Sequence, residues 1–187
     1  LNGTLATTNT TTGDITLTSN ATTISYPNSS NTNGTISLAT GRSLTINQTG
    51  STASTTSSTL AGVISGAGRV QKDTANSVLT LSGNNTFTGS VTLNKGTLEV
   101  THNNGLGASA GGVTVASGTV LDLKGVTVGA EALTLNGGML KVSTGSSSLA
   151  GAVSLGAAST LSVPGTALTL SGVVNDNNFG ITLRSEE

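Results

Sequence analysis

Residues 91–123 read VTLNKGTLEVTHNNGLGASAGGVTVASGTVLDL, and the fold follows from the pattern in this stretch. It holds two kinds of short unit in which one polar residue lies between two aliphatic ones. The first is Val91-Thr92-Leu93, which returns further along the chain as Val113-Thr114-Val115. The second is Leu98-Glu99-Val100, which returns at a nearly equal offset as Leu121-Asp122-Leu123. This period-two alternation, rich in β-branched residues, predicts short strands.

Both series continue towards the C-terminus. The first continues with units that begin at Leu133, Val153, Leu168 and Ile181. The second continues with units that begin at Leu140 and Leu161. A repeat of about 20 residues cannot bury its apolar face alone, but stacked repeats form a continuous core. We therefore predict an all-β fold, a right-handed parallel β-helix (solenoid) with roughly 20–22 residues per coil, because parallel crossovers are right-handed. The leucines at 98, 121, 140 and 161 should then stand in one vertical file.

The charged residues agree with a one-sided core. Glu99, Asp122 and Lys141 each lie between two aliphatic neighbours, so the strand pleat should direct them outwards. An antiparallel sandwich is the alternative fold, but it would rarely repeat its units at a near-constant offset. Disorder is the other alternative, since the chain has 35 Thr and 25 Ser among 187 residues. The near-zero net charge and the regular apolar pattern argue against disorder.

Composition excludes several kinds of chemistry. The chain has no cysteine and one histidine, His102, which excludes disulfides, thiol catalysis and multi-histidine metal sites. Seven Lys and Arg with a net charge of −1 provide no basic surface for nucleic acid. No apolar run approaches the ~18 residues of a spanning helix, so we expect no membrane span in this segment. We predict no catalytic, cofactor-binding or metal-binding residue, and no cofactor.

Residues 66–100 read GAGRVQKDTANSVLTLSGNNTFTGSVTLNKGTLEV. This segment resembles the autotransporter-associated β-strand repeat, also called the passenger-associated transport repeat. The ordered blocks Asn85-Thr86-Phe87-Thr88-Gly89 and Gly96-Thr97-Leu98-Glu99-Val100 carry most of the resemblance. The other positions that fit the pattern are Gly66, Gly68, Val70, Lys72, Leu79, Leu81, Gly83 and Val91. The family pattern also suggests that Phe87 fills the core.

The resemblance implies a β-helical passenger segment of a bacterial autotransporter-like protein. Such a segment would be extracellular or at the cell surface of a Gram-negative bacterium, would build a stalk or adhesin, and would aid secretion through the outer membrane. It would not be an enzyme. We expect residues 1–187 to be one β-helical segment of a longer passenger, with irregular leading coils at 1–65, the repeat at 66–100 and regular coils at 101–187. Residues 47–59 lack large aliphatic side chains and are a candidate protruding loop.

Two short motifs in the Gly-rich stretch after the repeat match known functional motifs only in part. Residues 105–110 fit a dinucleotide fingerprint, but a strand follows them instead of the helix that such a site needs. Residues 107–111 fit a nucleophile elbow around Ser109, but the only histidine precedes that serine, against the required order. We expect both to be turns between coils.

Three functional hypotheses remain open. The first is a structural stalk with host-surface or cell–cell contacts along its sides. The second is a filament or biofilm fibre, built by end-to-end self-association of the open solenoid ends. The third is a carbohydrate-active enzyme with Glu99 and Asp122 as paired acids on adjacent coils. A solvated charged face is the favoured interpretation of that pair.

Overall fold

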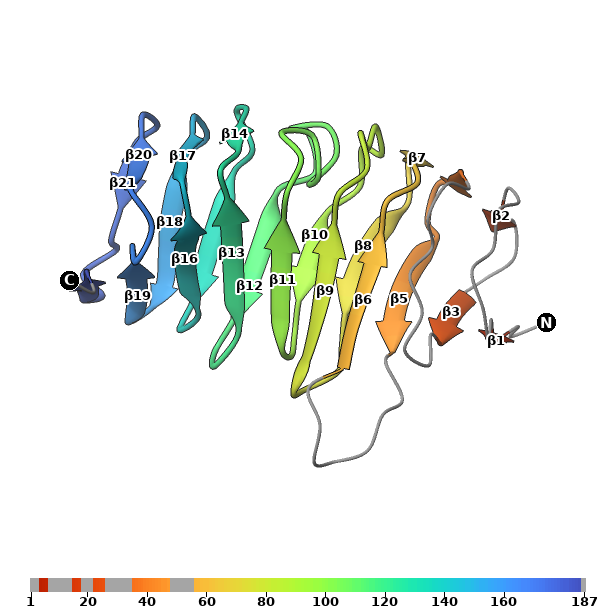
Figure 1. Ribbon diagram of the computed structural model, residues 1–187, viewed down its shortest axis with the longest axis horizontal. Coiled ribbons are helices and arrows are strands. Elements are labelled where there is room, and N and C mark those ends of the chain that lie inside the picture. The colour runs from red at the N-terminus through yellow and green to blue at the C-terminus, as the bar shows by residue number, and fades with distance from the viewer. Residues whose placement is uncertain (1–3, 7–14, 18–21, 26–34, 48–55, 186–187) are drawn as a thin grey trace.

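The chain is a stack of short β-strands along one long axis (Figure 1). The computed structural model describes residues 4–6, 15–17, 22–25, 35–47 and 56–185. In these residues every regular element is a strand, and none is a helix. The same ranges contain no long apolar helix that could cross a bilayer.

The strands form four sheets, which we name A to D. Sheet A contains β1 (Thr4–Ala6), β3 (Thr22–Ser25), β5 (Ser43–Asn47), β8 (Arg69–Lys72), β10 (Val91–Leu93), β12 (Val113–Ala116), β15 (Leu133–Asn136), β18 (Val153–Ala157) and β21 (Val174–Asn175). Sheet C contains β6 (Thr56–Leu60), β9 (Ser77–Leu81), β11 (Thr97–Val100), β13 (Val120–Lys124), β16 (Met139–Thr144), β19 (Ser159–Ser162) and β22 (Ile181–Arg184). Sheet B contains β2 (Ile15–Leu17), β4 (Ile36–Leu38) and β7 (Ile64–Gly66), and sheet D contains β14 (Thr127–Val128), β17 (Ser146–Leu149) and β20 (Ala167–Leu170).

Neighbouring strands are parallel and in register, which confirms the predicted β-solenoid. Leu98 pairs with Leu121, and Leu140 pairs with Leu121 on one side and Leu161 on the other. The predicted vertical file of leucines is therefore present. Sheet A repeats at a nearly constant step from β8 to β21, as the register partners of its strands show. The right-handed winding stays a prediction.

The end of the first sequence series was assigned wrongly. After Val153, sheet A continues to Val174 in β21. Leu168 lies instead in sheet D, and Ile181 lies in sheet C. The reason is that each C-terminal coil carries strands on three faces, so the shorter spacings of these units were steps around one coil.

The core is a narrow aliphatic seam between the sheets. Side chains alternate in and out along each strand, and in β9 the inward Leu79 and Leu81 are fully buried. Phe87 is also fully buried, which confirms its predicted place in the core. Burying each large aliphatic side chain contributes about 1.5–3 kcal/mol, so the stack gains stability coil by coil.

Glycine lines one corner of the solenoid, just before the first inward aliphatic residue of each sheet A strand. A Cβ atom added to Gly89 or Gly111 would lie closer than 3.0 Å to a carbonyl oxygen of the coil before it. The backbones of successive coils therefore touch at these two glycines, where a side chain would have no room. The residues at this corner, from β8 to β21, are Gly68, Gly89, Gly111, Glu131, Gly151 and Gly172.

The candidate loop at 47–59 overlaps the strands on either side of it. Its first residue is the end of β5, and its last four residues belong to β6, which pairs with β9. Residues 48–55 lie outside the described residues.

Candidate functional site

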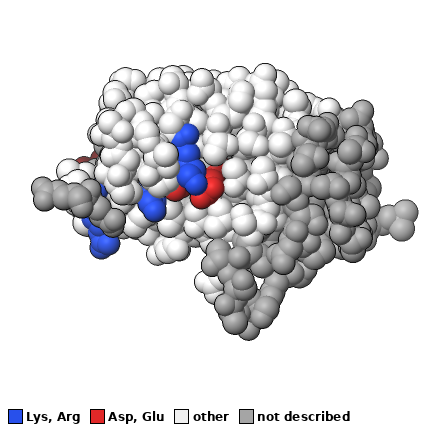
Figure 2. Space-filling view, in the orientation of Figure 1, with Lys and Arg blue, Asp and Glu red and all other residues white. Residues whose placement is uncertain are grey.

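Five of the twelve Asp, Glu, Lys and Arg side chains among the described residues lie on the outer face of sheet C. Figure 2 shows acidic and basic groups together near the middle of this face, with further charged groups towards the C-terminal end of the molecule. Strand register creates the cluster, because partners on parallel strands stack into one column. From β9 to β22 this outward column reads Thr80, Glu99, Asp122, Lys141, Ser162 and Arg184.

Glu99 and Asp122 are register partners on adjacent coils, as the sequence predicted. Glu99 is already engaged, since its Oε1 lies 2.9 Å from the Lys124 ammonium and its Oε2 accepts a 3.2 Å hydrogen bond from the Thr80 hydroxyl. Asp122 is only 4% exposed, and its Oδ1 accepts a 2.9 Å hydrogen bond from the backbone N–H of Ser143. Both carboxylates thus have internal partners, an arrangement that favours a structural role over acid–base chemistry.

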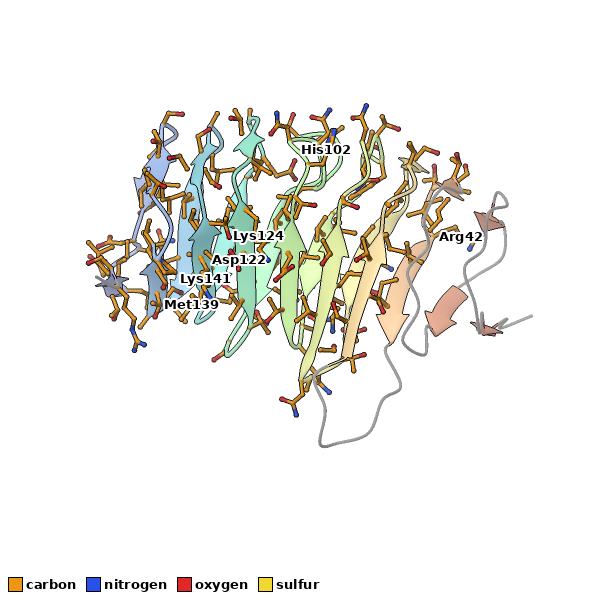
Figure 3. All side chains as sticks on the ribbon, viewed as in Figure 1. Arg42, His102, Asp122, Lys124, Met139 and Lys141 are labelled. Atoms are coloured by element: carbon orange, nitrogen blue, oxygen red, sulfur yellow. The ribbon has the colours of Figure 1, made fainter. Side chains whose placement is uncertain are left out.

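A groove crosses the strands beside this column. Its volume is about 330 Å³. Thr97, Val120 and Met139, which stack in a second outward column, form one wall, and the charged column forms the other. Figure 3 shows Asp122, Lys124, Met139 and Lys141 close together on β13 and β16.

The Gly-rich stretch after the repeat is a turn region, and the element that follows it in the sequence is the strand β12, not a helix. Ser109 is exposed. The Nδ1 atom of His102 accepts a 3.1 Å hydrogen bond from the backbone N–H of Asn104. The ring therefore stabilises its own loop through this atom. A dinucleotide site would need a helix N-terminus at this position.

Lys72 is a buried cation that sequence reasoning did not place. It pairs with Ile46 and Leu93 in sheet A, so it occupies an inward position of the core. Its ammonium donates 2.5 Å hydrogen bonds to the carbonyl oxygen of Thr74 and the hydroxyl of Ser77. Burial lowers the pKa of Lys72 to about 8, and the neighbouring negative charge of Asp73 opposes this effect. The alternation from Val70 could have revealed the inward direction of this side chain.

Asn85 links three successive coils. It is 2% exposed, and its Oδ1 accepts a 2.8 Å hydrogen bond from the backbone N–H of Ile64 in the preceding coil. Its Nδ2 donates a 2.7 Å hydrogen bond to the carbonyl oxygen of Gly105 in the following coil. Buried polar groups without partners are costly, so this amide holds both neighbouring turns in place.

Glu131 is the second buried ionisable group that the sequence did not reveal. It is 3% exposed and occupies the corner position that is glycine in neighbouring coils. It borders a cavity of about 10 Å³ whose other lining residues are aliphatic. Burial raises the pKa of Glu131 to about 7, although a hydrogen bond from the backbone of Gly112 acts in the opposite direction.

Comparison with known families gives one match. Residues 76–100 match the family described as passenger-associated-transport-repeat. The matched segment includes β9, the Asn85 amide, the buried Phe87, the corner glycine Gly89, and strands β10 and β11. Comparison with curated proteins and with solved structures finds no match. The matched repeat and the parallel β-solenoid fit a segment of an autotransporter passenger.

Proposed function

We propose that this chain is a structural segment of an autotransporter-like surface or secreted protein, which serves as a stalk and aids its own passage through the outer membrane. The repeat at 76–100 within a β-solenoid is the observation that carries this proposal. The repeat family is a structural passenger repeat, and the proposal includes no catalytic role. The proposal locates the segment outside a Gram-negative cell.

The contacts within the repeat support a role in secretion. Asn85 forms hydrogen bonds with the backbones of the preceding and following coils, and the backbone of Phe87 forms hydrogen bonds with Ile64 and Ala108 in the same two coils. The repeat therefore joins both neighbouring coils to its own. A chain that folds coil by coil needs a segment in which one coil fixes the next. The repeat supplies such a segment through the Asn85 amide, in addition to the common aliphatic file.

Deleting single coils tests the proposal. The segment would be displayed between a signal peptide and an outer-membrane translocator in a Gram-negative host. Removing residues 70–90 takes out one coil of the repeat and lets β10 follow the preceding coil. Removing residues 133–152 takes out one ordinary coil in the same way and is the matched control.

We expect the repeat deletion to reduce the amount of segment at the cell surface several-fold more than the control deletion. Surface labelling and protease accessibility on intact cells would measure this amount. Equal display of the two deletions would contradict a special role of the repeat in secretion. Failure of the intact segment to reach the surface would contradict the passenger assignment itself.

A further inference from the structure

We propose that the groove on the outer face of sheet C binds an acidic polysaccharide, with Lys141 and Arg184 as the groups that bind its uronic acid carboxylates. The groove contains the largest cluster of charged side chains among the described residues, and its two walls have different chemistry. One wall is neutral and partly aliphatic, and the other carries the charged column.

The charge that a ligand can reach in this groove is positive. Glu99 is paired with Lys124, and Asp122 is buried beneath its neighbours. Lys141 and Arg184 have no carboxylate within 4.0 Å among the described residues, since the Lys124–Glu99 pair is the one ion pair found there. An anion would therefore meet two cations that form no ion pair among the described residues.

The spacing of these cations fits an extended polymer. Lys141 and Arg184 stand in the same column with Ser162 between them, two strand spacings apart. At about 4.8 Å per strand, their Cα atoms are about 10 Å apart, and the groove from Glu99 to Arg184 is about 19 Å long. A stiff chain that carries a negative group at regular intervals can contact both cations at once.

The lining of the groove favours a sugar polymer over a peptide. From β11 to β19 the groove runs across parallel strands whose backbone groups pair with neighbours on both sides, so among the described residues it offers a peptide a free strand edge only at β22, the end of sheet C. Its other wall presents the hydroxyl of Thr97 and the apolar surface of Val120 and Met139. Sugar rings combine hydroxyl groups with apolar faces, which matches this mixture.

The test is a titration of the whole chain with oligomers of polygalacturonate, followed by calorimetry or NMR shifts. We expect binding that weakens as salt is added, and no binding of neutral glucan oligomers of equal length. Replacing Lys141 by methionine removes the charge but keeps the length of the side chain. This change should weaken binding about ten-fold, the effect of losing one charge-assisted hydrogen bond.

A matched pair of arginine variants provides the control. Arg184→Gln should weaken binding to a similar extent, whereas Arg69→Gln on the outer face of sheet A should leave it unchanged. Circular dichroism would verify that each variant keeps its fold. The proposal is overturned if the polyuronate does not bind at millimolar concentration or if the two arginine variants lose equal affinity. Tighter binding of polyglutamate, or equal binding of the neutral glucan, would also overturn it.

Discussion

Replacing Glu131 with glutamine should remove a pH dependence from the stability of the solenoid. Burial raises the pKa of Glu131 from 4.5 to about 7. Between these pH values the folded chain holds a proton on this carboxyl group that the unfolded chain has released. The free energy of unfolding of the wild-type chain should therefore fall as the pH rises through this window, and it should stay low above it.

The size of the effect follows from the two pKa values. The interval from 4.5 to about 7, at about 1.4 kcal/mol per pH unit, corresponds to a loss of about 3 kcal/mol. The glutamine side chain is uncharged at every pH and has nearly the same shape. The variant should thus match the wild type near pH 4.5 and be more stable by up to about 3 kcal/mol near pH 8.

Urea unfolding followed by far-UV circular dichroism would measure this difference across the pH range. An Asp176→Asn variant is the control, because it removes a carboxylate that is exposed instead of buried. Parallel profiles for the wild type and the glutamine variant would refute the reasoning, since a buried carboxyl without a partner charge must make stability depend on pH.

Three further substitutions test other parts of the fold. Gly111→Ala should destabilise by more than about 2 kcal/mol, because its Cβ would meet a backbone carbonyl, whereas Gly129→Ala meets nothing within 4 Å and should change stability by less than about 1 kcal/mol in thermal unfolding. Asn85→Ala leaves two backbone groups of adjacent coils without their side-chain partner and should cost about 3 kcal/mol in urea unfolding, and near-wild-type stability would contradict the bridging role. The lowered pKa of Lys72 makes the folded state favour the neutral amine, so the stability of the wild type should rise between pH 8 and pH 10.5. Lys72→Met should abolish this rise in urea unfolding, and an unchanged rise would contradict the burial of Lys72.

The repeating architecture could be predicted from the sequence because it depends on short-range alternation. Units such as Leu98-Glu99-Val100 show which side chains face inwards, and their return after about 20 residues shows which strands are neighbours. The pairing of Glu99 with Asp122 followed from the same two observations. Leu168 was misassigned because one coil can contain more than one such unit, and spacing alone does not distinguish the faces of a coil.

The site could be predicted only in part, since its electrostatics depend on distances between coils. The sequence indicated that Glu99 and Asp122 lie outside, but not that Lys124 pairs with the first or that the second is covered. Glu131 becomes notable only when the register places it among corner glycines. The lengths of the loops determine which residues of successive coils stack on one another. These lengths vary slightly from one coil of sheet A to the next and carry no local sequence signal.

Disulfide formation between engineered cysteines is the sharpest test of whether the coils stack in parallel register. The chain has no cysteine of its own, and Thr114 and Thr134 face outwards as direct partners on β12 and β15. Their Cα atoms should be about 5 Å apart, within the range that a disulfide bridges, whereas Thr114 and Ser154 should be about 10 Å apart. We predict that a mild oxidant closes the Thr114→Cys, Thr134→Cys pair and leaves the Thr114→Cys, Ser154→Cys pair open. Cross-linking of the second pair but not the first would contradict the stacked solenoid.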